Sequence, residues 1–135
     1  MELRPDQYSI IHNMIDTEKF RYVKKTPELR KKVLTIKPFA NKKYANDLTT
    51  KGILELSKRP CFQDMEFAIY GRGELFDETN RPLKKFPNVS LHNVFLTQSE
   101  IAALHKQYGV YIATTRMDAQ GVSRDEAMSS APENF

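Results

Sequence analysis

The sequence predicts an α/β protein with a Rossmann-like, doubly wound and mainly parallel sheet that carries helices on both faces. Short runs rich in Val, Ile, Leu and Phe alternate along the chain with segments of helical periodicity. No internal repeat or low-complexity stretch interrupts this alternation. Strands that alternate with helices need crossover connections, which produce parallel strands with helices over both faces of the sheet.

Four strands are expected after a short apolar run at residues 8–12, which we interpret as a brief strand or an extended leading segment. The clearest strand ends before Pro38, which has no backbone N–H to give to a sheet. The turn Gly71-Arg72-Gly73 ends the second strand. The expected strands cover residues 32–36, 65–70, 89–92 and 110–114.

Four helices are expected between and after these strands. In the first helix, Leu48, Ile53 and Leu56 recur at helical spacing. The third helix has Thr97 or Ser99 as its N-cap, since a hydroxyl there accepts a hydrogen bond from a free backbone N–H. The expected helices cover residues 48–57, 74–85, 99–106 and 123–130.

Composition limits the classes of function. Hydrophobic residues make up 40% of the 135 residues, which suffices for the core of one domain. No run of about 18 apolar residues predicts a membrane span. Cys61 is the single cysteine, so we expect no disulfide and a reducing, cytoplasmic environment. His12, His92 and His105 lack the spacing of metal ligands, so we expect no metal site.

The net charge is +4, and basic residues cluster in the N-terminal third of the chain. The cluster consists of Arg21, Lys24, Lys25, Arg30, Lys31, Lys32 and Lys37. Such charge attracts anions. We expect a phosphorylated small molecule and not nucleic acid, because no helix-turn-helix or zinc-finger spacing accompanies the charge. Attraction to an acidic membrane surface stays open.

The predicted sheet brings distant residues together at its carboxyl edge. In the usual doubly wound order the fourth strand lies beside the first, so the topological switch point falls between Lys37 and residues 116–121. Ligands of such sheets bind in the crevice at this point. The chain stops after the helix at residues 123–130, where another strand is expected. We therefore expect a fragment whose fourth strand has an exposed edge.

The segment before the last helix has two interpretations that its residues leave open. Gly121 permits close backbone approach, and the amides of Val122 and Ser123 are free at the helix start, where they favour an anion such as a diphosphate. Glu126 lies one turn further on, within reach of ribose hydroxyls. Alternatively, Ser123 and Glu126 form a capping box that serves only the helix.

Several short motifs, taken in order, resemble the nucleotide-sugar-binding, C-terminal domain of the group 1 retaining glycosyltransferases of GT-B fold. These motifs are residues 11–16, 51–52, 67–75, 87–91, 108–112 and 118–131. The family carries two glutamates separated by seven residues. Here the second is Glu126, but the first is Asp118, which keeps the charge on a shorter side chain.

The resemblance implies roles for individual residues. Glu126 would bind the ribose of the donor nucleotide, and Asp118 would lie near the transferred sugar as a catalytic residue. The backbone amides of Gly121, Val122 and Ser123 would hold the diphosphate and the sugar.

Two lysines would neutralise the donor diphosphate. Lys51 matches the family's lysine–glycine pair, and Lys37 lies near the position of a family arginine. Lysine serves a phosphate as a point charge, without the two-bond geometry of arginine. Arg72 would touch a phosphate or the sugar, or the turn that contains it would only close a strand–helix junction.

The resemblance also implies a reaction and its partners. Full-length relatives transfer a sugar from a nucleotide donor to an acceptor hydroxyl with retention of configuration, without a cofactor or a protein-bound metal. The N-terminal domain that binds the acceptor is absent from residues 1–135, so we expect donor binding with little or no transfer. Peripheral association of the full-length enzyme with a membrane is a further expectation.

Two other functions stay open. A dinucleotide-binding domain of the oxidoreductase type needs a third glycine after Gly71 and Gly73, but Phe76 occupies that position. The other is a non-catalytic module that binds a polyanion or a partner protein through the basic N-terminal third. Steep salt dependence of nucleic-acid binding would favour this module.

Overall fold

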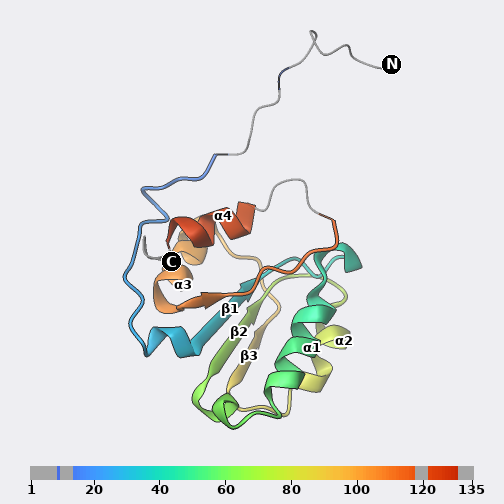
Figure 1. Cartoon of the computed structure of the whole chain (residues 1–135). Helices are drawn as coiled ribbons and strands as arrows, with labels where there is room; N and C mark the ends of the chain where they lie inside the picture. The colour runs from blue at the N-terminus through green and yellow to red at the C-terminus, as the bar shows by residue number, and fades with distance from the viewer. Residues whose placement is uncertain (1–8, 10–13, 118–121, 131–135) are drawn as a thin grey trace, which may run out of the picture.

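The computed structural model describes Ser9, residues 14–117 and residues 122–130, with Ser123 described by its backbone alone. These residues form a four-stranded parallel sheet in the order β3-β2-β1-β4, with helices on both faces (Figure 1). The strands are β1 (Lys32–Ile36), β2 (Glu66–Tyr70), β3 (Val89–His92) and β4 (Val110–Tyr111). The helices are α1 (Asn46–Leu56), α2 (Phe76–Asn80), α3 (Gln98–Gln107) and α4 (Val122–Ser129). The predicted fold class and the position of the fourth strand beside the first are confirmed.

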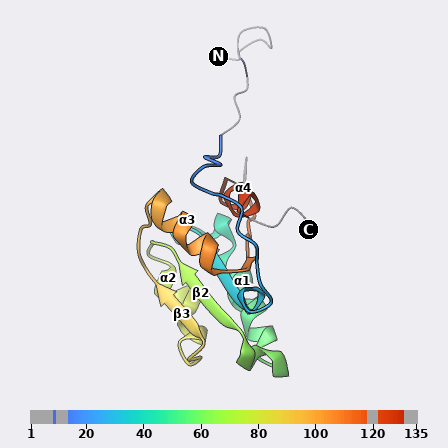
Figure 2. The same cartoon turned by 90° about the vertical axis from the view of Figure 1, so that its left-hand side faces the viewer.

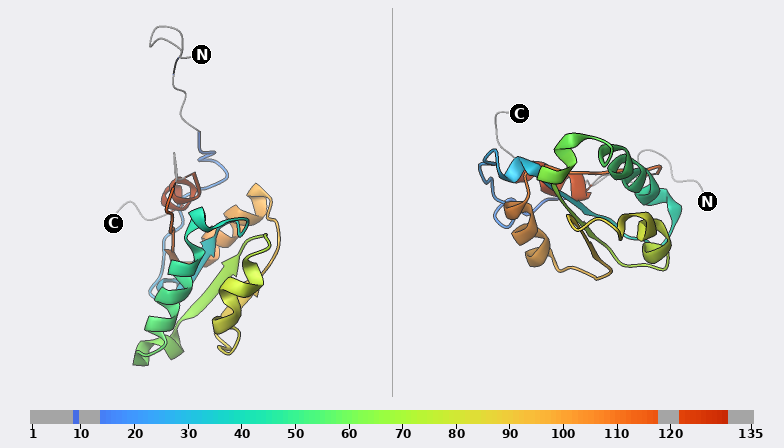
Figure 3. Two further views of the ribbon diagram at one scale, coloured as in Figure 1. Left: turned by 90° about the vertical axis from the view of Figure 1, so that its right-hand side faces the viewer. Right: turned by 90° about the horizontal axis from the view of Figure 1, so that it is seen from below.

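The two faces of the sheet carry different helices. Figure 3 shows α1 and α2 together on one face, and Figure 2 shows α3 and α4 on the other. The main apolar core lies under α1 and α2, because alternate residues of β1 and β2 point to that side. Its buried members are Val33, Phe39, Ile53, Phe62, Phe67, Ile69, Phe76 and Leu83.

β4 is shorter than the predicted strand at residues 110–114. Its pairing with β1 places Tyr111 opposite Leu34, and the Ile112 N–H still donates to the Leu34 carbonyl at 2.9 Å. The Thr35 hydroxyl then donates to the Ile112 carbonyl at 3.0 Å, and the chain leaves the ladder. Among the described residues β4 pairs with β1 alone, so it lies at an edge of the sheet.

The N-terminal cap of α3 is confirmed as Thr97. Its hydroxyl accepts from the Glu100 N–H at 3.3 Å, and the Glu100 carboxylate accepts from the Thr97 N–H at 2.7 Å. This reciprocal pair satisfies two backbone donors that the first turn leaves free.

Two other helices differ in extent from the prediction. α1 begins at Asn46, two residues earlier than expected, directly after Ala45 in a left-handed conformation with φ of 55°. The helix expected at residues 74–85 is divided into α2 and a 3-10 turn, Arg81–Leu83. Pro82 lacks the N–H that an α-helix would need at this point.

Two further predictions concern the leading segment and membranes. Of the strand expected at residues 8–12, only Ser9 lies within the described residues, and it is not in a strand. No helix in the described part of the chain has the length and apolar character needed to cross a bilayer.

Gly71 ends β2 at a point where no side chain fits. A Cβ there would lie 1.9 Å from the Lys37 carbonyl oxygen and 2.7 Å from the Phe39 ring. The segment that follows β1 and the end of β2 are in direct contact, since the Lys37 N–H donates to the Tyr70 carbonyl at 3.1 Å. Gly52, in the middle of α1, offers the opposite case, since a Cβ there would meet nothing within 4 Å.

We expect Gly71→Ala to lower the free energy of unfolding by roughly 1–3 kcal/mol, because the added methyl forces the loop after β1 away from β2. The matched control Gly52→Ala should raise it by about 0.5–1 kcal/mol, since alanine is the better helix former. Urea unfolding of the parent and the two variants measures both changes in the free energy of unfolding. A Gly71→Ala variant as stable as the parent would show that the two connections are not packed as described.

Candidate functional site

The carboxyl edge of the sheet is the candidate site because the chain leaves it there in two directions. β1 continues into residues 37–45 and α1, on one face. β4, which pairs with β1, continues into residues 112–117 and toward α4, on the other face (Figure 1). This is the predicted topological switch point, the place where ligands of such sheets bind. Residues 114–116 of the second connection lie against the turn before α1.

Lys37 lies directly after β1 at this edge, and the residue is only 7% exposed. No carboxylate or carbonyl group within the described part of the chain accepts a hydrogen bond from its ammonium group. The ammonium group is not among the buried side-chain atoms that lack a partner within the described residues. A cation at the carboxyl edge of the sheet attracts an anion, so Lys37 stays a candidate for the predicted diphosphate contact.

Arg72 lies at the same edge, in the turn after β2. Its side chain is exposed, and its carbonyl accepts from the Phe39 N–H at 2.9 Å. The Gly73 N–H donates to Asn93 Oδ1 at 3.4 Å, so the turn joins the end of β2 to the segment after β3. The turn therefore closes the strand–helix junction, one of its two predicted roles, beside the connection that begins at Lys37.

Phe76 stands where a dinucleotide fingerprint needs its third glycine. It is buried, and its ring meets the Phe39 ring edge-to-face with centroids 4.8 Å apart. The position therefore serves the apolar core and leaves no space for a close backbone approach at the start of α2.

Lys51 lies on the exposed side of α1, one turn after Asp47. The Asp47 carboxylate is within the electrostatic reach of Lys51 and accepts from Arg116 at 2.7 and 2.8 Å. Lys51 thus lies on the side of α1 near the connection from β4, in the middle of the helix and not at its start.

Glu126 is buried in α4, with 8% of the residue exposed. Burial raises the pKa of its carboxyl group, and no described residue donates a hydrogen bond to that group. A buried carboxylate is more stable when hydrogen-bond donors reach it. Glu126 is therefore suited to accept hydrogen bonds from the hydroxyls of a ligand.

The capping-box interpretation of Ser123 is wrong. α4 begins at Val122, so Ser123 lies inside the helix, whereas a capping residue precedes the first helical residue. The side chain of Ser123, and all of Asp118 and Gly121, lie outside the described residues, so their predicted roles stay predictions.

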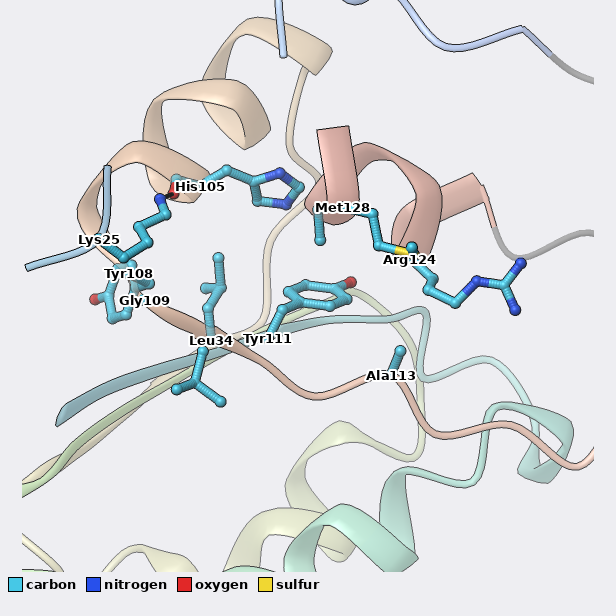
Figure 4. Close-up of a pocket in the computed structure, with 11 residues that line it drawn as sticks. Lys25, Leu34, His105, Tyr108, Gly109, Tyr111, Ala113, Arg124 and Met128 are labelled. Carbon is cyan, nitrogen blue, oxygen red and sulfur yellow. Dashed lines mark hydrogen bonds between the residues drawn. The ribbon is translucent and has the colours of Figure 1, made fainter. Parts of the chain in front are cut away.

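A separate cavity of about 260 Å³ lies between β4, α3 and α4 (Figure 4). Leu34, Tyr111 and Met128 contribute to its mainly apolar lining. Among the predicted site residues that the structure describes, none lines this cavity. Arg124 borders it, but its guanidinium pairs with Asp125 at 3.1 Å.

Two basic residues that line this cavity are buried, which the sequence pattern did not predict. The ammonium group of Lys25 donates to the backbone carbonyl of His105, which Figure 4 shows at the end of α3. The His105 ring lies between Phe20 and Tyr111, with centroid distances of 5.5 Å to each. His105 follows buried Ala102 by three positions on α3, and this helical spacing is the only signal in the sequence for its burial.

Burial and the charge of Lys25 lower the pKa of His105 to about 4. The Glu126 carbonyl nearby favours the charged form, but it is not within hydrogen-bond geometry of either ring nitrogen. The neutral ring therefore joins the N-terminal segment, α3 and α4 into one layer, and α4 carries Glu126.

No protein-family profile and no curated protein matches the sequence. Among solved structures, the fold is similar to the C-terminal domain of a glycosyl transferase group 1 family protein (LpcC) from Francisella tularensis, with a TM-score of 0.64 and 17% sequence identity. The similarity covers 87% of this chain and 67% of that chain. At this identity it establishes the shared fold.

We expect the free energy of unfolding to fall as the pH decreases from about 6.5 toward 4, because the unfolded chain binds a proton on His105 that the folded chain resists. The loss attributable to His105 is roughly 1–3 kcal/mol. Glu126, whose pKa is raised, contributes a slope of the opposite sign, and Asp47, with a pKa of about 2, titrates below this range.

Denaturant unfolding at a series of pH values, on the parent and on His105→Leu, isolates the contribution of His105 as the difference between the two slopes. His92→Gln is the control and should keep the parental slope, because His105 is intact in it. Equal slopes for the parent and His105→Leu would contradict the assignment.

Proposed function

We propose that this chain is the donor-binding domain of a retaining GT-B glycosyltransferase, and that a nucleoside diphosphate sugar binds at the carboxyl edge of its sheet. The fold similarity to the C-terminal domain of a group 1 glycosyl transferase supports the class. The observation that carries the proposal is the place of Lys37, directly after β1 at the switch point between β1 and β4, with no partner for its ammonium group among the described residues.

The proposed chemistry is the departure of the nucleoside diphosphate from the anomeric carbon of the sugar. Negative charge develops on the leaving diphosphate as that bond breaks. Cations that are already in place stabilise this charge without reorganisation. In the proposed site, Lys37, Lys51 and Arg72 supply this positive charge from three separate elements.

The nucleoside and the sugar are assigned to the connection between β4 and α4. The Glu126 carboxylate accepts hydrogen bonds from the ribose hydroxyls, which offset the cost of its burial. The amides of Gly121, Val122 and Ser123 hold the diphosphate, and Asp118 lies beside the transferred sugar. These roles follow from the sequence motif, with Glu126 supported in addition by its buried carboxylate.

In this proposal residues 1–135 supply the donor half of the enzyme, and an N-terminal domain supplies the acceptor half. The chain alone therefore binds the donor and transfers little or no sugar. The full-length enzyme acts in the cytoplasm, at a membrane surface if its acceptor lies there.

The other two functions receive less support. Phe76 fills the place of a fingerprint glycine with a core aromatic ring. Within the basic N-terminal third, Lys25 is buried, Lys31 lies 3.9 Å from Glu28, and Lys32 lies 3.7 Å from Glu66. Because these three lysines are buried or lie near a carboxylate, the surface of the N-terminal third is less positive than its number of basic residues suggests.

We expect a nucleoside diphosphate to raise the thermal unfolding midpoint, because a ligand that binds only the folded state stabilises it by mass action. The screen compares the uridine, guanosine and adenosine diphosphates and their sugar conjugates at matched ionic strength. Nicotinamide dinucleotides and a DNA oligomer serve as the competing classes. Stabilisation by either of these, with none by any nucleoside diphosphate, would overturn the proposal.

Variants of the charged residues test the site itself. Glu126→Gln and Lys51→Ala should each weaken the binding of the nucleoside diphosphate about tenfold or more, since a charge-assisted hydrogen bond contributes about 1.5–3 kcal/mol. Lys37→Met keeps the buried aliphatic part of the side chain and should weaken binding similarly. Calorimetric titration measures the affinities.

Two lysines of the same elements provide controls. Lys58 follows the end of α1, paired with Glu55 at 2.9 Å, and Lys32 begins β1 at the opposite edge of the sheet. Lys58→Ala and Lys32→Ala should bind like the parent. If the folded Glu126→Gln, Lys51→Ala and Lys37→Met variants all bind the nucleoside diphosphate as tightly as the parent, the assignment of the site is wrong.

A further inference from the structure

One ion pair joins the connection that follows β4 to the start of α1. Arg116 lies in the connection that leaves β4, and Asp47 lies in the first turn of α1. Two guanidinium nitrogens of Arg116 donate to the two carboxylate oxygens of Asp47, at 2.7 and 2.8 Å. Two parallel hydrogen bonds fix the orientation of the guanidinium relative to the carboxylate, whereas a single contact between point charges does not.

Arg116 also holds the turn before α1. Its Nη1 donates to the Lys42 carbonyl at 3.0 Å, and its backbone N–H donates to the Lys43 carbonyl at 2.7 Å. Two residues before Arg116, the Thr114 hydroxyl donates to the Tyr44 carbonyl at 3.2 Å and lies 3.0 Å from the Thr49 hydroxyl. The connection from β4 is thus fixed along the 3-10 turn Lys42–Tyr44 and the start of α1.

The same turn is fixed to the end of β1. Asn46, beside Asp47, donates through Nδ2 to the Pro38 carbonyl at 2.8 Å. The loop from Pro38 to Asn46 is therefore closed on itself, and Lys37 lies at its base. A displacement of Arg116 would be transmitted through Asp47 and Asn46 to the part of the crevice that carries Lys37.

We infer that Arg116 is a positioning residue of the proposed donor site, which acts through Asp47 to hold the connection from β4 at a fixed place against the loop that follows β1. The inference rests on the proposed function for its ligand. Its claim about the two connections rests on the geometry alone.

The charge balance of the pair favours positioning over direct contact with a phosphate. Asp47 already neutralises Arg116, and the guanidinium holds the pKa of the Asp47 carboxyl at about 2. The pair therefore stays ionised across the neutral pH range. If Arg116 instead bound the anion, removal of the Asp47 charge would free the guanidinium and strengthen anion binding.

The test uses three variants and inorganic pyrophosphate, a probe that shares the diphosphate chemistry of every candidate donor. Asp47→Asn removes the charge with little change of shape, and Asp47→Glu keeps the carboxylate. Glu55→Gln is the control, because it breaks the Lys58 pair near the other end of the same helix. Thermal unfolding without ligand shows that each variant is folded.

Amide hydrogen exchange without ligand measures the positioning directly. In Asp47→Asn the amides of Arg116 and Ala45, which donate to Lys43 and Lys42, should exchange on the order of tenfold faster, as expected for local opening. Exchange in Asp47→Glu and in Glu55→Gln should stay close to that of the parent. Parental exchange rates in Asp47→Asn would overturn the inference, whatever the ligand.

Calorimetry with pyrophosphate measures the consequence for the site. Asp47→Asn should bind it about fivefold more weakly, because the crevice is no longer preorganised, and Asp47→Glu should recover most of the affinity. Tighter binding to Asp47→Asn would contradict the positioning role. If the parent binds neither pyrophosphate nor a nucleoside diphosphate, the proposed function fails, and the exchange rates still decide whether the pair positions the two connections.

Discussion

The parallel pairing of β1 with β4 is the interaction on which the arrangement of this protein depends. Leu34 lies opposite Tyr111, and the ladder ends just beyond this pair. Because the strands are parallel, both connections leave the same edge of the sheet, and the connection from β4 there contacts the turn before α1. Lys37 and Arg116 lie in these two connections.

Close backbone packing joins the loop after β1 to the turn after β2. The Lys37 and Phe39 N–H groups donate to the Tyr70 and Arg72 carbonyls, and Gly71 leaves room for this approach only because it has no side chain. Phe39 then enters the core against Phe76. The loop that begins at Lys37 is thus joined to the main apolar core through Phe39.

The layer formed by the N-terminal segment, α3 and α4 is held by different forces. Here Phe20, a neutral His105 and a buried Lys25 take the place of an extended apolar core. The Ser129 hydroxyl donates to the Phe20 carbonyl at 2.8 Å, and the Val23 N–H donates to the Ser130 carbonyl at 3.3 Å, so the end of α4 depends on the N-terminal segment. α4, which this layer holds in place, also carries Glu126.

The sequence by itself determined the order of strands and helices, the parallel class of the sheet and an N-cap at Thr97 or Ser99, because each depends on residues close together in the chain. Local pattern also placed Lys37 and Arg72 at strand ends. It misplaced the start of α1, extended β4 too far and left open a cap at Ser123, because tertiary hydrogen bonds decide where such elements begin and end.

Only the tertiary structure decided which charged groups are buried and which are paired. Asp47 and Arg116 are 69 positions apart, and Lys25 and His105 are 80 positions apart. Periodicity carries no information across such separations, because it reports the face of one element and not the element that covers it. Burial and ionic pairing arise only when elements pack, which is why the two charged contacts that organise this chain could not be foreseen from its residues alone.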